Sequence, residues 1–172
     1  LTMYFIGDAD IETIKQIVNN HFCDLPRVGF IKYTGDLGNH DVCFATHWTT
    51  VYPMVQHKEK IKYPFYFVQD YEPMFAPMGS EYILAENTYR MGLTHITSGP
   101  WPATILKNKF NAEAAFFRFP IDRDVYNTSI KRTKANKNIV FFARPEMPRR
   151  CYELGIMALK LVKEKRPDIE II

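Results

Sequence analysis

FYFVQDYEPMF, which covers Phe65 to Phe75, is the stretch that best indicates how the chain folds. Its first half is apolar and aromatic, and a short run of this kind predicts a buried strand over residues 63–69. The strand ends in an amide and two carboxylates, Gln69, Asp70 and Glu72, immediately before a proline. Taken alone, such an end is either a solvated turn or a site that holds a general base, and composition favours the turn.

Short apolar runs and helical patterns alternate on both sides of this stretch. Further strands are predicted at residues 3–8, 28–33, 41–46, 93–98 and 114–119, and helices at residues 11–22, 47–58, 80–91 and 99–110. The run at 41–46 is apolar enough to be buried on both faces. We expect Asp8 or Asp10 to cap the first helix, Ser80 to cap the third, and Pro53 to lie in the first turn of the second. The alternation predicts an α/β fold with a parallel sheet, in which ligands bind outside the carboxyl ends of the strands.

The composition changes after residue 120. Residues 121–137 are polar and basic with almost no apolar periodicity, which predicts a linker. A strand at 138–145, a helix that begins near Pro148 and a strand at 168–172 then predict one further βαβ unit. The apolar face of this helix comprises Cys151, Leu154, Gly155, Ala158, Leu161 and Val162. We therefore expect an N-terminal domain over residues 1–120 and an incomplete C-terminal domain over residues 138–172.

The overall composition limits the classes of protein. The 172 residues suit one domain or two small ones, and 47% hydrophobic with 24% charged residues is an ordinary globular composition. A net charge of +3 is too small to indicate nucleic-acid binding. Three cysteines without a CxxC pair predict neither a disulfide framework nor a zinc site, and they indicate a reducing compartment. The sequence has no membrane-length apolar run and no signal peptide, and its lack of an initiator methionine indicates a piece of a longer polypeptide.

Arginines gather in FARPEMPRR, where the C-terminal strand passes into its helix, at Arg144, Arg149 and Arg150. Cations in the first turn of a helix oppose its dipole at a cost of a few tenths to about 1 kcal/mol each, so Arg149 and Arg150 break a local rule. Beside free backbone N–H groups, three guanidinium groups suit a phosphate or diphosphate. The alternative is that Arg144 pairs with Glu146 while the other two face water.

Two other strand ends carry an aromatic side chain that suits a sugar or a nucleobase. His47 and Trp48 follow the third predicted strand, where His47 could act as a base and Trp48 could stack on a ligand. Gly99 and Trp101 follow the fifth, where Gly99 allows close backbone approach and Trp101 could border a cleft. Each pair has a structural alternative, namely packing at a helix start and a simple chain turn. The remaining histidines show no metal-ligand spacing.

Residues 141–172, FFARPEMPRRCYELGIMALKLVKEKRPDIEII, resemble the start of the second Rossmann-like domain of retaining family 4 glycosyltransferases. In that family a Gly-Arg pair and a later Lys bind the donor diphosphate. Here Ala143 replaces the Gly, Arg144 matches the Arg, and Arg149 or Arg150 stands near the position of the Lys. Upstream, DVCFATHWTT, YFVQDYEPMF, SEYILAENTYRMG and THITSGPW resemble the rhamnosyltransferases of bacterial surface-polysaccharide and rhamnan synthesis. The resemblance covers about residues 41–172.

The resemblance implies a GT-B enzyme, in which two Rossmann-like domains face each other across a cleft. It implies a nucleotide-sugar donor such as dTDP-rhamnose, a growing surface polysaccharide as acceptor, and no metal or other cofactor, because arginines and a helix N-terminus neutralise the leaving diphosphate. Arg144, Arg149 and Arg150 would bind that diphosphate. Asp70 and Glu72 would be the catalytic candidates. The acceptor side of the cleft would be lined by Gln69, Asp70, Glu72, His47, Trp48, Gly99 and Trp101.

Other outcomes stay open at this point. The glutamate pair that holds the donor sugar in the family is not among these residues, so we expect little or no transferase activity from them alone. The alternatives are an inactive fragment, a nucleotide-binding or regulatory α/β module, and a nucleotide-sugar epimerase, which the missing GxGxxG disfavours. The expected location is the cytoplasm, including the inner face of the membrane, where basic residues 131–137 either touch an anionic surface or stay solvated.

Overall fold

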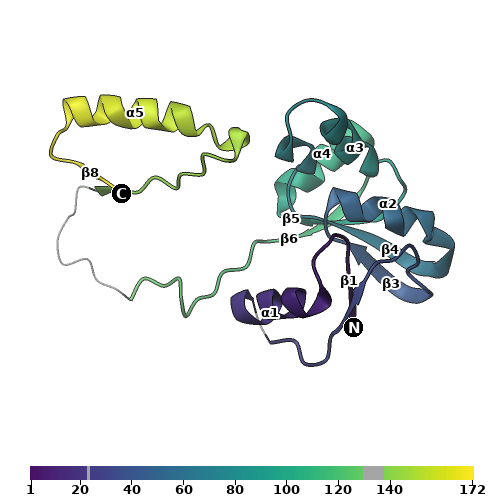
Figure 1. Cartoon of the computed structure of the whole chain (residues 1–172). Helices are drawn as coiled ribbons and strands as arrows, with labels where there is room; N and C mark the ends of the chain where they lie inside the picture. Colours follow the sequence, from purple (N-terminus) through teal and green to yellow (C-terminus); the bar gives the residue numbers. More distant parts are fainter. Residues whose placement is uncertain (23, 130–137) are drawn as a thin grey trace.

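Parallel strand pairs organise the chain in the computed structural model, which describes residues 1–22, 24–129 and 138–172 (Figure 1). The strands are β1 Thr2–Phe5, β2 Gly29–Lys32, β3 His40–Ala45, β4 Ile61–Val68, β5 Thr94–Ser98, β6 Ala114–Phe117, β7 Asn138–Ile139 and β8 Glu170–Ile171. The helices are α1 Ile11–His21, α2 Trp48–Gln56, α3 Ser80–Thr88, α4 Pro100–Phe110 and α5 Tyr152–Lys165, and the 3₁₀ turns are η1 Lys58–Lys60, η2 Glu72–Phe75 and η3 Pro148–Arg150. Within the described ranges, the strands form the pair β1–β2, a sheet in the order β3-β4-β5-β6, and the pair β7–β8. Every pairing is parallel, which confirms the predicted α/β class.

The four-stranded sheet carries α2, α3 and α4 on one side (Figure 1). Each of these helices connects two neighbouring parallel strands, and the strands follow one another across the sheet in the order of the chain. Crossovers of the usual right hand then place all three helices on the same face. α2 packs on β3, α4 packs on β5 and β6, and α3 rests on α2 and η2. The carboxyl ends of β3, β4 and β5 therefore lie along one side of the sheet, which is called its carboxyl edge below. The segments that carry the predicted acceptor-side residues leave the sheet there.

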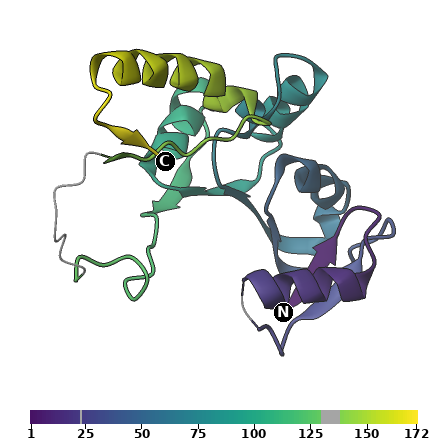
Figure 2. The same ribbon diagram turned by 60° about the vertical axis from the view of Figure 1, so that its left-hand side comes forward.

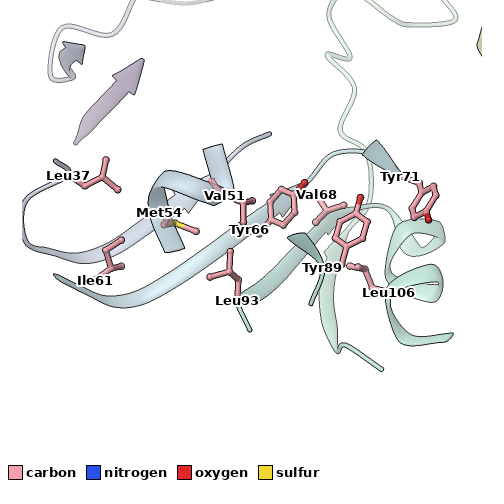
Figure 3. Packing of buried hydrophobic residues seen from close by; sticks show 11 residues of the cluster. Leu37, Val51, Met54, Ile61, Tyr66, Val68, Tyr71, Tyr89, Leu93 and Leu106 are labelled. Carbon is pink, nitrogen blue, oxygen red and sulfur yellow. The ribbon is translucent and has the colours of Figure 1, made fainter. Parts of the chain in front are cut away.

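A row of buried side chains lies between the sheet and its helices (Figure 3). The ring of Tyr89, just after α3, is at the centre of this core and is 2% exposed. Its centroid lies 5.8 Å from that of Tyr66 and 5.9 Å from that of Tyr71. On the α4 side it lies 5.2 Å from the ring of Phe110. The aliphatic part of the core includes Leu37, Val51, Met54, Ile61, Val68, Leu93 and Leu106.

The opposite face of the sheet is open, so the expectation that the strand at residues 41–46 is buried on both faces is wrong. On β3, Val42 and Phe44 keep 48% and 51% of their surface exposed. Phe44 stacks there on Phe65 of β4, with ring centroids 5.1 Å apart. The consecutive strand order is the reason, because it sends the three crossover helices of this sheet to the other face.

Side chains cap the starts of α1 and α2. Asp10 caps α1, as predicted, and accepts a backbone N–H of the first turn at 2.9 Å. α2 begins at Trp48 because a capping box forms at its start, so Pro53 lies inside the helix and not in its first turn as expected. α3 has Gly79 as its N-cap, and Ser80 is its first helical residue, so the predicted Ser80 cap is also wrong.

The C-terminal unit, defined as β7, α5 and β8, follows residues 118–129, which contain no helix or strand (Figures 1 and 2). β7 ends at Ile139, far short of the strand predicted at 138–145. β8 is similarly limited to Glu170–Ile171. Residues 130–137 of the predicted linker lie outside the described residues, and the domain boundaries stay predictions.

α5 begins later than the sequence indicates, at Tyr152. Pro148–Arg150 form the separate turn η3, and Cys151 adopts a left-handed backbone conformation, with φ of 50°, between the turn and the helix. Arg149 and Arg150 are therefore not in the first turn of α5, which corrects the expectation that its dipole acts on them directly. The left-handed backbone conformation of Cys151 is the physical reason, because it separates Arg149 and Arg150 from the hydrogen-bonded turns of α5.

The inward face of α5 also differs from the predicted one, since Leu154 and Leu161 are mostly exposed. The half-buried positions are Tyr152, Gly155, Ile156, Leu159 and Val162. Gly155 explains the change, because its missing side chain lets the Phe141 ring lie directly against the helix. A Cβ atom at Gly155 would fall only 2.8 Å from Cε2 of Phe141 and nearer still to the tip of the ring.

Gly155→Ala is expected to destabilise the C-terminal unit by about 1–3 kcal/mol, because the added methyl group overlaps the Phe141 ring. This penalty outweighs the helix preference for alanine over glycine of about 1 kcal/mol. Faster hydrogen exchange of the α5 amides would measure the effect. Adding Phe141→Leu to the same variant should restore part of the lost protection. Unchanged or slower exchange in Gly155→Ala alone would contradict the packing described.

Candidate ligand site at the carboxyl edge of the sheet

The segments that follow β3 and β4 meet at the shared edge of the sheet. The two strands are paired up to Ala45 and Tyr66, so the residues beyond them leave side by side. The Gln69 amide donates to the carbonyl of Thr46 at 3.0 Å. Further along the same two segments, the backbone N–H of Trp48 donates to Glu72 at 2.6 Å. The polar stretch after β4 is therefore held against the start of α2, as parallel pairing predicts.

His47 is the N-cap of α2. Its Nδ1 accepts the backbone N–H of Thr49 at 3.4 Å and lies 2.8 Å from the hydroxyl of the same residue. The Thr50 hydroxyl closes the capping box by accepting the His47 N–H at 3.2 Å. Burial lowers the pKa of His47, which favours the neutral ring, in which Nδ1 can act as an acceptor. The imidazole also stacks on the ring of Phe75, with centroids 6.0 Å apart.

Glu72 is enclosed, with 1% of its surface exposed. Its backbone N–H donates to the Tyr89 hydroxyl at 3.1 Å, and its Oε2 accepts from Trp48. Among the described residues, its Oε1 and the Tyr66 hydroxyl are both buried without a hydrogen-bond partner of good geometry. Burial raises the pKa of Glu72 to about 7, against the lowering effect of Tyr66 and of the Trp48 N–H.

Asp70 and Arg149 form a direct contact between the sheet edge and the C-terminal unit, although their predicted roles place them on opposite sides of a cleft. Asp70 Oδ2 lies 2.6 Å from Nη1 of Arg149, and the two side chains keep 35% and 26% of their surface exposed. The guanidinium of Arg149 also lies over the Phe75 ring, 4.6 Å from its centroid. Figure 2 shows η3, which carries Arg149, turned toward the helical side of the central sheet.

The other two predicted anion ligands, Arg144 and Arg150, are exposed. The Arg144 guanidinium lies 4.9 Å from the Phe142 ring centroid, and its Nη1 is 3.6 Å from the sulfur of Met147. The suggested pair of Arg144 with Glu146 does not form among the described residues. Both arginines therefore keep donor groups that face solvent.

Gly99 and Trp101 belong to the β5–β6 side of the edge. The N–H of Gly99 donates to the Phe117 carbonyl at 2.8 Å, and its φ of 87° is one that glycine adopts without strain. Trp101, in the first turn of α4, is half exposed. In the part of the chain that the structure describes, neither residue forms a hydrogen bond or a ring contact with His47 or Asp70. The roles assigned to the predicted site residues remain predictions.

The described residues contain no group of three or more His, Cys, Asp or Glu side chains placed to hold a metal ion. Among the same residues, none of the helices is both long enough and apolar enough to cross a bilayer.

Parts of the chain are similar to known proteins. Residues 25–98 match the family described as WsaF, N-terminal domain. Over 133 residues, or 77% of this chain, the sequence is 32% identical to the O-antigen biosynthesis protein RfbC of Myxococcus xanthus. The chain spans about 10% of the length of that relative. The family match contains His47, Trp48, Gln69, Asp70 and Glu72, so the similarity includes the place where the ends of β3 and β4 meet.

Proposed function

We propose that the chain is part of a glycosyltransferase of surface-polysaccharide synthesis that takes a nucleotide sugar as donor. The 32% identity to a protein named for O-antigen biosynthesis and the match of residues 25–98 to the WsaF N-terminal domain support this proposal. The structural observation that carries it is the contact of Asp70 with Arg149, because it brings an arginine-bearing βαβ unit to the carboxyl edge of a parallel sheet. Ligands of open α/β sheets bind at such an edge.

The finer proposal is a GT-B arrangement. Residues 1–120 form the acceptor side, residues 138–172 begin the donor side, and dTDP-rhamnose is the donor. Catalysis in such a site is mainly electrostatic, because fixed cations stabilise the negative charge that develops on the leaving diphosphate. The exposed guanidinium groups of Arg144 and Arg150 are free to do this without a metal ion, whereas Arg149 is engaged by Asp70.

The expected test result is that dTDP raises the melting temperature of the chain and that Arg144→Ala weakens dTDP binding by about tenfold or more, since hydrogen bonds to charged groups are among the strongest. Titration followed by thermal shift or calorimetry measures the change in Kd. UDP and NAD serve as comparison ligands.

Arg166→Ala is the matched control, because Arg166 lies at the other end of α5 and pairs with Asp168 at 2.9 Å. It should leave the Kd for dTDP unchanged. Equal dTDP affinity in the chain and in Arg144→Ala, or no response to any nucleotide, would overturn the proposed donor site.

A further inference from the structure

Arg149 is bound at once by two side chains of the segment that connects β4 to α3. Its Nη1 donates to Asp70 Oδ2 at 2.6 Å, and its guanidinium plane covers the Phe75 ring at 4.6 Å. Its Nε is enclosed without a hydrogen-bond partner within the described part of the chain. A carboxylate beside an aromatic face binds a guanidinium through a charge-assisted hydrogen bond and a cation–π contact together.

The receptor for this guanidinium, defined as Asp70 and Phe75, is held in place by contacts that do not involve Arg149. Asp70 Oδ1 accepts the backbone N–H of Tyr71 at 2.8 Å, which fixes the carboxylate at the end of β4. Phe75 stacks on His47 with an interplanar angle of 13°, and His47 is itself fixed as the cap of α2. The receptor is therefore organised in advance, so little ordering is needed when a guanidinium enters it.

The turn η3 separates the two neighbouring arginines of the C-terminal unit. The N–H of Arg150 donates to the Met147 carbonyl at 2.8 Å, and that of Cys151 donates to the Pro148 carbonyl at 3.0 Å. This tight turn places Arg149 in the receptor and leaves Arg150 exposed. The side chain of Arg149 is thus committed to the sheet edge, while Arg150 remains open to an anion.

We propose that Arg149 is the docking residue of the C-terminal unit, and that Asp70 and Phe75 form its receptor on the sheet. Arg149 then acts by positioning: it fixes η3, and with it Arg150, relative to the carboxyl edge, and it is not itself a diphosphate ligand. This inference goes beyond the proposed function, because it assigns a protein partner to a side chain that the resemblance gives to the donor. It holds for the chain without nucleotide and does not require transferase activity.

The test compares Arg149→Ala with Arg150→Ala by hydrogen exchange of the full chain in the absence of nucleotide. Arg149→Ala is expected to raise exchange about tenfold or more, both in residues 70–76 and in residues 148–152, because it removes a charged hydrogen bond and a cation–π contact together. Arg150→Ala, on the same turn, should change neither segment. Arg149→Lys should give an intermediate result, since lysine keeps the charge without the planar guanidinium.

Swapping the two charged residues, Asp70 and Arg149, tests the inference even if Arg149→Ala disturbs the whole chain. Asp70→Arg and Arg149→Asp should each raise exchange in both segments, and the double variant should restore protection. Failure of the double variant to do so would overturn the docking role. So would unchanged exchange in Arg149→Ala combined with a loss of dTDP binding, because that result would make Arg149 a ligand. Lack of dTDP binding in the unmodified chain would count against the proposed donor site and leave these exchange results intact.

Discussion

Glu72→Gln is expected to stabilise the folded chain at pH 8 by on the order of 3 kcal/mol, because burial raises the pKa of Glu72 from 4.5 to about 7. The carboxyl group binds its proton more tightly in the folded than in the unfolded chain. Its contribution to stability is therefore fully present below about pH 4.5 and is lost as the pH rises through about 7. Glutamine keeps an oxygen for the Trp48 N–H without a charge to bury, so the gain should vanish near pH 4.5.

Urea unfolding at several pH values between 4.5 and 8.5 measures this effect. The free energy of unfolding of the unmodified chain should fall across that range more steeply than that of Glu72→Gln. Glu59→Gln is the matched control, because Glu59 is an exposed carboxylate in η1 and its replacement should leave the slope unchanged. If the free energy of unfolding changes with pH in the same way for the unmodified chain and for Glu72→Gln, the carboxyl group is not buried in its charged form.

Tyr89→Ala is expected to lower the free energy of unfolding by about 3–5 kcal/mol, the usual cost of deleting a large buried aromatic side chain. The ring packs against four other aromatic rings, so its removal leaves a cavity at the centre of the core. Tyr89→Phe isolates the hydroxyl. That change should cost about 1–3 kcal/mol, because the buried N–H of Glu72 loses its acceptor.

Thermal and chemical unfolding of the two Tyr89 variants measures the cost of losing the ring and the cost of losing the hydroxyl. Tyr63→Phe is the control, since Tyr63 is half exposed on the open face of the sheet, and the change there should stay within about 0.5 kcal/mol. A Tyr89→Phe variant as stable as the unmodified chain would mean that the Glu72 N–H finds another acceptor. A small effect of Tyr89→Ala would mean that the aromatic core is not the main source of stability.

The α/β fold was predictable from sequence because its signals are local. β4 follows directly from the apolar run before Gln69, and α4 follows from the pattern after Gly99. The meeting of the β3 and β4 ends was also predictable, since parallel strands leave at one edge. The limits of β7 and α5 were not, because they depend on how Phe141 packs against Gly155 and on the left-handed residue Cys151.

The inner arrangement of the candidate site could not be predicted in the same way. Glu72 looks like a turn residue in sequence, and it is buried because Trp48, 24 positions away, and Tyr89, 17 positions away, supply its partners. The partner of Asp70 is Arg149, 79 positions along the chain. Contacts at such separations leave no periodic pattern in a single sequence. The high content of aromatic residues, at 15%, was the one available sign of the stacked core.

The strand order β3-β4-β5-β6 has a consequence for how the sheet forms during synthesis. Each strand pairs with the one that left the ribosome just before it, so no strand waits for a distant partner. Contacts of short sequence separation form fastest, and chains begin to fold from their N-terminal side as they are made. We expect the sheet to grow strand by strand in the order of translation, with the ends of β3 and β4 meeting first and Arg149 arriving last.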